Sequence, residues 1–154
     1  MGIEKEISTN YFRNHRHKGV VNIIFTSNWI LERLRKFLEA EDITPQQYNI
    51  LRILQKSDLP LSTLKIREKM MDKMSDTSRI VERLLKKKLV HKQICSYDKR
   101  LVDVTISEAG AQLLQRLDKK TDELDSMISN LSDEETDTIN RLLDKMREKE
   151  QNGL

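Results

Sequence analysis

Hydrophobic residues recur at helical spacings over most of the chain, which predicts a mainly α protein. Residues 8–40 carry an apolar surface wider than one narrow stripe, so we expect one long helix that is buried on several sides. Further helices are expected over about 45–55, 63–70, 75–88 and 107–130, and from 132 onward. Between 89 and 107 β-branched residues and alternation of apolar with polar positions predict two strands joined by a turn.

Side chains that cap helices support these starting points. Thr44 and Gln47 are spaced as a capping box, in which each side chain bonds the other residue's backbone N–H. Ser132 and Glu135 have the same spacing before the last helix. Ser62 and Ser107 are expected to cap the helices that follow them.

The order of the middle elements predicts a winged helix. Two short helices across a tight connection make a helix-turn-helix unit, and a hairpin follows at once. Its turn carries Asp98, Lys99 and Arg100, where a turn that only reverses the chain would favour Gly, Asn or Pro. The second helix can enter the major groove of DNA, and the hairpin can reach the neighbouring minor groove or backbone. We interpret the tip as a DNA contact, with Asp98 holding the Arg100 guanidinium in position.

The distribution of charge agrees with this interpretation. Although the net charge is only +3, residues 61–107 hold 12 Lys and Arg against 6 Asp and Glu. Residues 108–154 hold 7 against 12, and residues 1–60 hold 9 against 7. A basic middle beside an acidic tail indicates a module that binds a polyanion, although lysine-rich helix surfaces also serve solubility.

At these residues the sequence resembles the MarR family of bacterial transcription regulators. The wing of that family has the form D-x-R, followed by a helix start of the form Leu/Ile-Thr/Ser-x-x-Gly, and this chain has Asp98-Lys99-Arg100 and later Ile106-Ser107-Glu108-Ala109-Gly110. The segment LSTLKIREKMMDKMSDTSRIVERLLKKKLV is similar to the helix-turn-helix of the family. One departure is Lys88, which stands where the family usually has Gly before the first wing strand. The preceding helix must therefore end without the usual left-handed cap, or Lys88 must carry a strain of about 1 kcal/mol.

The resemblance implies a winged helix-turn-helix with N- and C-terminal dimerisation helices, mainly α with a small β-hairpin wing. Residues 1–43 would form the N-terminal dimerisation helix, 44–107 the DNA-binding region and 108–154 the C-terminal dimerisation helices, intertwined as one domain. The apolar surface of 8–40 and the apolar seam of 107–150 independently exceed what one protomer can cover, which favours a homodimer. A two-fold dimer predicts a pseudo-palindromic operator.

The candidate DNA-binding residues lie on the two short helices, their connection and the wing tip. They are Ser62, Lys73, Ser75, Asp76, Thr77, Ser78, Arg79, Arg83, Lys86, Asp98, Lys99 and Arg100. Arg79 is expected to bind guanine or clamp a phosphate, whereas Lys73, Lys86 and Lys99 suit phosphates. Glu82 is expected to pair with a neighbouring Lys or Arg rather than to bind cytosine.

Other residues raise questions of ligands and redox sensing. Phe25, Trp29 and Tyr48 are candidates for an apolar pocket, since family members bind small aromatic or phenolic effectors between the dimer and DNA-binding regions; ordinary core packing is the alternative. Cys95 makes a redox-sensing regulator a further alternative, but we expect it on a wing strand rather than on the N-terminal helix where such relatives have their cysteine.

No enzymatic function is expected, because the chain has no Gly-rich phosphate loop, nucleophile elbow or His-Glu metal helix. We expect no metal site or cofactor, since His15 and His17 would point to different faces of a helix and His91 is isolated. No apolar run is long enough to span a membrane, and the first residues do not have the pattern of a signal peptide, so a cytoplasmic location is expected.

We therefore expect a ligand-responsive repressor that binds double-stranded DNA as a homodimer. The alternative from another class is an adaptor whose winged helix binds a protein partner, which would require exposed apolar anchors on that face.

Overall fold

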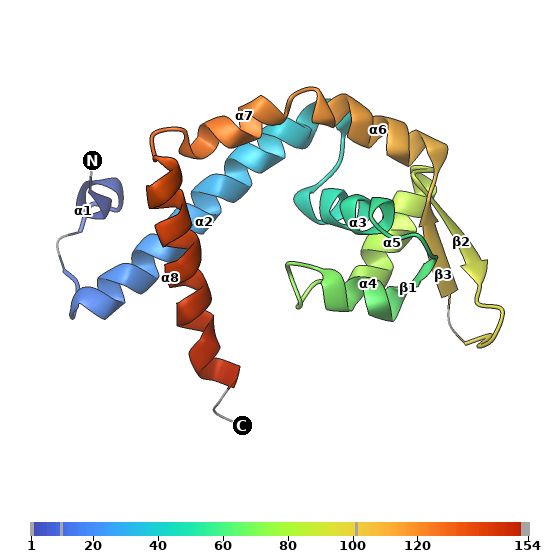
Figure 1. Ribbon diagram of the computed structural model, residues 1–154, viewed down its shortest axis with the longest axis horizontal. Coiled ribbons are helices and arrows are strands. Elements are labelled where there is room, and N and C mark those ends of the chain that lie inside the picture. Colours follow the sequence, from blue (N-terminus) through green and yellow to red (C-terminus); the bar gives the residue numbers. More distant parts are fainter. Residues whose placement is uncertain (1, 10, 101, 152–154) are drawn as a thin grey trace. The chain divides into compact units, whose positions relative to one another are not determined.

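The computed structural model describes residues 2–9, 11–100 and 102–151, and the described chain forms two compact units. The first unit, Met1–Lys120, holds the helices and strands shown from blue to orange in Figure 1. These are α1 (Ile3–Glu6), α2 (His15–Leu38), η1 (Glu39–Glu41), α3 (Pro45–Gln55), β1 (Leu61–Ser62), α4 (Thr63–Lys69), α5 (Thr77–Lys86), β2 (Val90–Ile94), β3 (Val102–Ile106) and α6 (Glu108–Asp118). The second unit, Thr121–Leu154, contains α7 (Thr121–Asp125), η2 (Ser126–Ile128) and α8 (Asp133–Gln151).

The predicted fold class is confirmed, and so are the expected caps. The Thr44 hydroxyl accepts from the Gln47 N–H at 3.1 Å, while the Gln47 side chain accepts from the Thr44 N–H at the same distance. Ser62 and Ser107 cap α4 and α6 through the N–H groups of Lys65 and Gly110. The second capping box, between Ser132 and Glu135, is also present.

Two expected helices are shorter than their apolar patterns suggested. The helix expected over 8–40 begins at His15, because the Asn14 side chain accepts from the His17 N–H at 2.9 Å and caps it there. The helix expected over 107–130 is divided, since α6 ends at Asp118 and the Lys120 N–H bonds the Leu117 carbonyl in a tightened turn. No apolar residue lies between Leu117 and Leu124, so the core does not hold this stretch in one helix.

The core of the first unit lies between α3, α4, α5, α6 and the sheet. Its fully buried members include Ile50, Ile66, Leu84, Val104 and Leu114. Each comes from a different element, so the helix-turn-helix, the wing and α6 are packed around the same apolar side chains. Burial of this kind contributes about 1.5–3 kcal/mol for each large side chain.

The sheet has three antiparallel strands in the order β1-β3-β2 rather than the two of a simple hairpin. β2 pairs with β3 over Val90↔Ile106 to Ile94↔Val102, which builds the expected wing. The two-residue strand β1 adds Leu61↔Val104 on the other edge of β3. The start of α4 is thereby hydrogen-bonded to the wing.

The base of the wing has a tight junction where α5 ends and α6 begins. Lys88 adopts a left-handed conformation with φ 60°, so the structure selects the strained one of the two expected solutions. The Lys88 N–H bonds the Leu85 carbonyl and the Leu89 N–H bonds the Leu84 carbonyl, which together form a Schellman motif. The Leu89 carbonyl then accepts from the Ser107 N–H at 3.0 Å. Gly110 is required here, because a Cβ would lie 2.3 Å from that same carbonyl oxygen.

Candidate nucleic-acid interface

Helix α5 has a sharply two-sided surface. Thr77, Ile80, Val81 and Leu84 are buried against the core, while the opposite side is exposed. The helix begins after Asp76, whose side chain caps it by accepting from the Arg79 N–H at 3.2 Å. The exposed side presents Ser78, Arg79, Glu82, Arg83 and Lys86.

Three cations on this exposed face are available for an external anion. Arg79, Arg83 and Lys86 form no ion pair within the described part of the chain. Glu82 instead pairs with Lys92 on β2, as expected for this glutamate. The pair compensates the negative charge of Glu82 on this face and joins α5 to the wing.

The wing tip holds an arginine in a fixed orientation. Arg100 donates from Nε to Asp98 Oδ1 at 3.1 Å and from a terminal nitrogen to Oδ2 at 3.2 Å, while its own N–H also bonds Asp98. These bonds lower the pKa of the Asp98 carboxyl, because they favour its ionised form. The Arg100 side chain remains 90% exposed, so the fork orients the guanidinium without covering it. Lys99 beside it is exposed as well.

Three of the candidate DNA-binding residues face inward. Ser62, Ser75 and Thr77 are 4–9% exposed. Ser62 caps α4, and the Ser75 hydroxyl donates to the Asp72 carbonyl at 2.9 Å. Thr77 is buried at the first position of α5, which begins there rather than at 75 as expected, while Ile80, Val81 and Leu84 form the expected apolar side of the helix.

The connection between α4 and α5 is organised by side chains outside the expected set of site residues. Asp72 accepts from the Met74 N–H at 3.0 Å, and Asn49 of α3 accepts from the Met71 N–H at the same distance. Lys73, an expected phosphate contact, is exposed and bonds the Glu68 carbonyl. A polar residue two positions before a turn N–H is a recognisable Asx-turn signal, so Asp72 could have been found from the sequence.

The aromatic residues proposed for an effector pocket are only half-buried. Phe25 and Trp29 lie on α2, where the Arg33 guanidinium stacks on the Trp29 ring at 4.1 Å. Tyr48 lies on α3, and its hydroxyl accepts from Arg52 at 3.0–3.1 Å. Trp29 and Tyr48 therefore each already contact an arginine.

Other expectations concern redox chemistry, metals and membranes. Cys95 lies directly after the end of β2 at Ile94 and not on a wing strand as expected, and it is 2% exposed, which keeps its sulfur away from solvent oxidants. Within residues 2–9, 11–100 and 102–151, no three His, Cys, Asp or Glu side chains are grouped to hold a metal ion. Among the described helices, none is long and apolar enough to cross a membrane.

Comparisons with known proteins agree with this geometry. The model of the MarR family matches residues 43–102, which contain the helix-turn-helix and most of the wing. No curated protein matches the chain. Among solved structures, a MarR-like transcription regulator from Bacillus cereus ATCC 10987 has 22% identity and a TM-score of 0.78, over 86% of this chain and 96% of its own.

Two further solved structures contain bound molecules. A cysteine-to-serine mutant of MarR from E. coli, complexed with operator DNA, has 19% identity and a TM-score of 0.74 over 95% of this chain and 99% of its own. The organohalide-sensing regulator RdhR, in a form bound to 2,4-dichlorophenol, has 19% identity and a TM-score of 0.80 over 88% of this chain and 80% of its own. At these identities the likeness to solved structures shows the fold alone, while the family model matches the part of the chain in which the sequence resembles the MarR family.

Proposed function

We propose that this chain, a MarR-family protein by its residues 43–102, is a transcription regulator that binds double-stranded DNA as a homodimer. One observation carries the proposal: the exposed face of α5 presents cations that form no ion pair with any residue the structure describes, and the wing beside it presents an oriented Arg100. A helix and a hairpin tip placed next to each other match the major groove and the backbone or minor groove beside it. The complex of the related MarR with operator DNA supports the same assignment.

Within this interface we assign different tasks to different cations. Arg79, in the first turn of α5, is placed to contact base edges, because the N-terminal part of a recognition helix lies deepest in the groove. Lys86 and Lys99 have flexible point charges that suit phosphates. Arg100 is held by Asp98 so that it gives up less rotamer entropy on binding.

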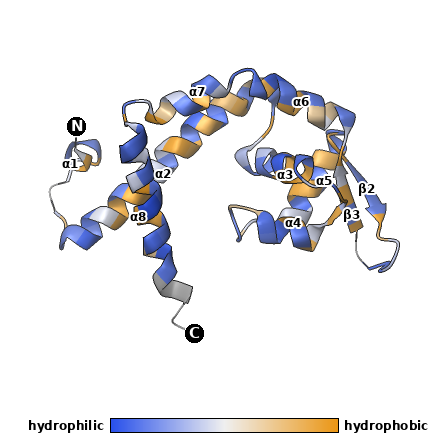
Figure 2. Cartoon of the chain, in the orientation of Figure 1, coloured by the Kyte–Doolittle hydropathy of each residue, from blue (hydrophilic) through white to orange (hydrophobic). Residues whose placement is uncertain are grey.

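The homodimer is supported by exposed apolar residues on each of two helices, shown in orange along α2 and α8 in Figure 2. On α2 the side chains of Val20 and Ile24 are 53% and 57% exposed, and on α8 those of Leu142 and Met146 are both 51% exposed. Exposed apolar stripes of this extent on helices indicate surfaces that bind another protein chain. We expect light scattering to give about twice the 18.2 kDa mass of one chain. Ile24→Lys should yield monomers, whereas Met71→Lys, at a still more exposed site on the helix-turn-helix connection, should leave the dimer intact.

The DNA-binding proposal is tested by selection from a random duplex library, followed by fluorescence anisotropy with the enriched sequence. We expect an inverted repeat, and we expect Arg100→Ala to weaken binding by about 1–3 kcal/mol for each DNA group that the arginine touches. Lys119→Ala is the matched control, since this exposed lysine at the end of α6 lies outside the proposed interface. Equal affinities for the parent and Arg100→Ala would exclude Arg100 from DNA contact.

Ligand response and repression complete the proposal. The dichlorophenol complex of RdhR supports an aromatic effector for a protein of this fold, and Phe25, Trp29 and Tyr48 remain our candidates to contact it. An effector could act only by binding better to a conformation that fits the operator poorly. We place the protein in the cytoplasm, where its DNA lies.

One observation favours the adaptor alternative. Leu64, Met71 and Met74, around the helix-turn-helix connection, are 58%, 78% and 90% exposed and could act as anchors for a protein partner. Apolar side chains at such positions can also contact thymine methyl groups. The selection experiment separates the two functions, because an adaptor would enrich no sequence and would bind all duplexes equally weakly.

A further inference from the structure

A hollow of about 410 Å³ lies where the helix-turn-helix connection leads into α5. Its lining comes from α4, where it includes Leu64 and Arg67, and from Met74 with the first residues of α5. Leu64 is 58% exposed and Met74 is 90% exposed. Two large apolar side chains are therefore uncovered in one hollow, a pattern that indicates contact with another molecule.

The charges around the hollow favour an anionic partner. Residues 63–79 hold five Lys and Arg against three Asp and Glu. Arg67 and Arg79 are exposed, and neither forms an ion pair with any residue that the structure describes. Asp76 is the acid in the lining, and its carboxylate is engaged as the cap of α5. Asp72, close by in the connection, accepts from the Met74 N–H at 3.0 Å.

The major groove of DNA matches both the apolar and the basic side chains of the hollow. Phosphates border this groove, and the C5-methyl group of thymine projects into it as an apolar group. Asp76, Thr77 and Ser78 bring the hollow to the start of α5, and the N-terminal part of a recognition helix lies against base edges. The position of the hollow therefore favours DNA over a protein partner as the molecule that covers it.

We propose that Leu64 and Met74 contact thymine methyl groups in each half-site of the operator, and that Arg67 binds a phosphate beside them. The apolar contacts would select thymine, whereas the arginine would add affinity without base preference. The assignment rests on the proposed DNA-binding function and refines it by naming a base that the protein selects.

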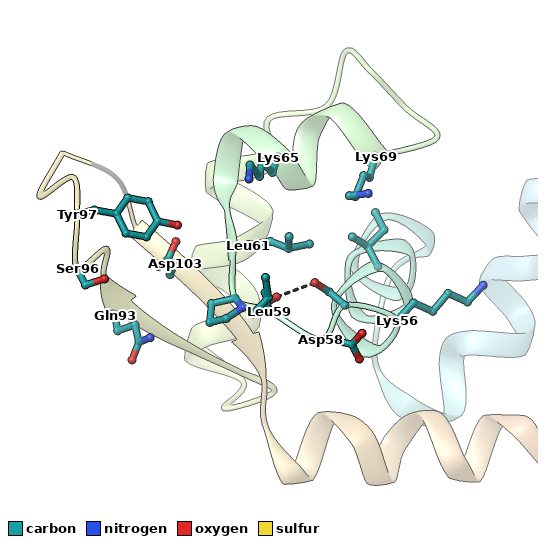
Figure 3. Close-up of a pocket in the computed structure, with 13 residues that line it drawn as sticks. Lys56, Asp58, Leu59, Leu61, Lys65, Lys69, Gln93, Ser96, Tyr97 and Asp103 are labelled. Atoms are coloured by element: carbon teal, nitrogen blue, oxygen red, sulfur yellow. Dashed lines mark hydrogen bonds between the residues drawn. The ribbon is translucent and has the colours of Figure 1, made fainter.

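Another side of α4 has a different character. Lys65 and Lys69 line a separate cavity of about 860 Å³, together with the 57–61 loop and residues of the wing, as Figure 3 shows. Asp58 and Asp103 belong to the same lining. Leu64, Arg67 and Met74 do not line that cavity, so substitutions at these three positions leave its lining unchanged.

The test removes single methyl groups from the DNA and leaves its hydrogen-bonding groups unchanged. In the enriched operator, each thymine of a half-site is replaced in turn by deoxyuridine, at the symmetric positions of both half-sites. Fluorescence anisotropy then gives the Kd for each duplex. At the contacted positions we expect the Kd to rise about fourfold for each methyl group lost, and hence about 15-fold for the symmetric pair. Deoxyuridine outside the half-sites should leave the Kd unchanged.

Variants of the two apolar residues connect this effect to the hollow. In Leu64→Ala and in Met74→Ala, the ratio of the Kd for the deoxyuridine duplex to the Kd for the thymine duplex should fall toward one at the position that each residue contacts. Met71→Ala is the matched control, because Met71 is 78% exposed but does not line the hollow. It should keep the full ratio at every position.

Arg67 is tested through the salt dependence of binding. Arg67→Gln should weaken binding to operator and random DNA alike and reduce the salt slope by about two per dimer, while the ratio between deoxyuridine and thymine duplexes stays the same. Lys65→Gln, a charge removal on the side of α4 shown in Figure 3, should leave the salt slope unchanged.

The proposal is overturned if deoxyuridine has no effect at any thymine of the half-sites, or if Leu64→Ala and Met74→Ala both keep the ratio of the parent. In either case specific binding of the parent to the operator would leave the proposed function standing. If both alanine variants also bound the operator as tightly as the parent, the hollow would be free for a protein partner. A library from which no sequence is enriched would contradict the proposed function and the thymine contacts together.

Discussion

Replacing Lys88 with Gly should stabilise the protein, although it removes a side chain from the base of the wing. Lys88 closes the Schellman motif at the end of α5 with φ 60°, a conformation that crowds its Cβ against the backbone. The crowding costs a residue with a side chain about 1–2 kcal/mol, and glycine avoids it. Glycine in turn gives up about 0.5–1 kcal/mol more backbone entropy on folding. The difference leaves Lys88→Gly more stable than Lys88→Ala by about 1 kcal/mol.

The comparison with alanine isolates the backbone effect, because both variants lack the exposed lysine side chain. Urea denaturation at one fixed protein concentration measures the difference, which corresponds to a rise in Tm of about 2–4 °C for a chain of this length. The neighbouring Lys87 supplies the control, since its φ is −78° and needs no glycine. Lys87→Gly should be less stable than Lys87→Ala by about 0.5–1 kcal/mol. A glycine variant that is the less stable one at both positions would refute this account of Lys88.

Two further predictions concern a surface ion pair and the separate tasks of the DNA-binding cations. Glu41 on η1 accepts from Arg116 on α6 at 2.8–2.9 Å, and these bonds lower the pKa of the Glu41 carboxyl below its ordinary 4.5. The pair therefore stabilises the fold above that pH, and its effect disappears as the pH falls through the folded-state pKa. Glu41→Gln should cost under about 1 kcal/mol at pH 7, because Arg116 is half-exposed, and the cost should shrink as the pH falls through the folded-state pKa of Glu41; urea denaturation at a series of pH values checks both. In competition titrations at two salt concentrations, Lys86→Ala should weaken binding to operator and random DNA alike and reduce the salt slope by about two per dimer. Arg79→Ala should weaken operator binding more; an equal weakening on both DNAs would move Arg79 to the phosphate contacts.

Local signals in the sequence predicted much of the fold correctly. A cap depends on residues three apart, so Thr44 with Gln47 could be recognised without knowing what surrounds them. The wing fork is equally local, since Asp98 and Arg100 are two residues apart. The left-handed conformation of Lys88 was one of the two predicted helix endings, because such an ending also depends only on neighbouring residues.

Features that depend on distant parts of the chain could not be predicted in this way. The two residues of β1 have no recognisable pattern of their own, and pair only because the fold brings them to Val104. Ser75, Asp76 and Thr77 are three adjacent polar residues, and each could cap the helix that follows. In the structure Asp76 is the cap and the other two are buried, an outcome that depends on packing. The break after Asp118 likewise reflects where the core ends rather than any helix-breaking residue.

The contacts at α6 determine how the proposed DNA-binding surface can move. At its start, Ser107 binds the Leu89 carbonyl through its N–H and the Lys88 carbonyl through its hydroxyl, so α6 is fixed to the end of α5. Farther along, Asp118 pairs with Arg52 of α3. Because Glu82 also ties α5 to the wing, these elements cannot shift independently without breaking buried or paired contacts. The winged helix should therefore move as one body, and an effector that alters DNA binding has to reposition that body rather than deform its recognition helix.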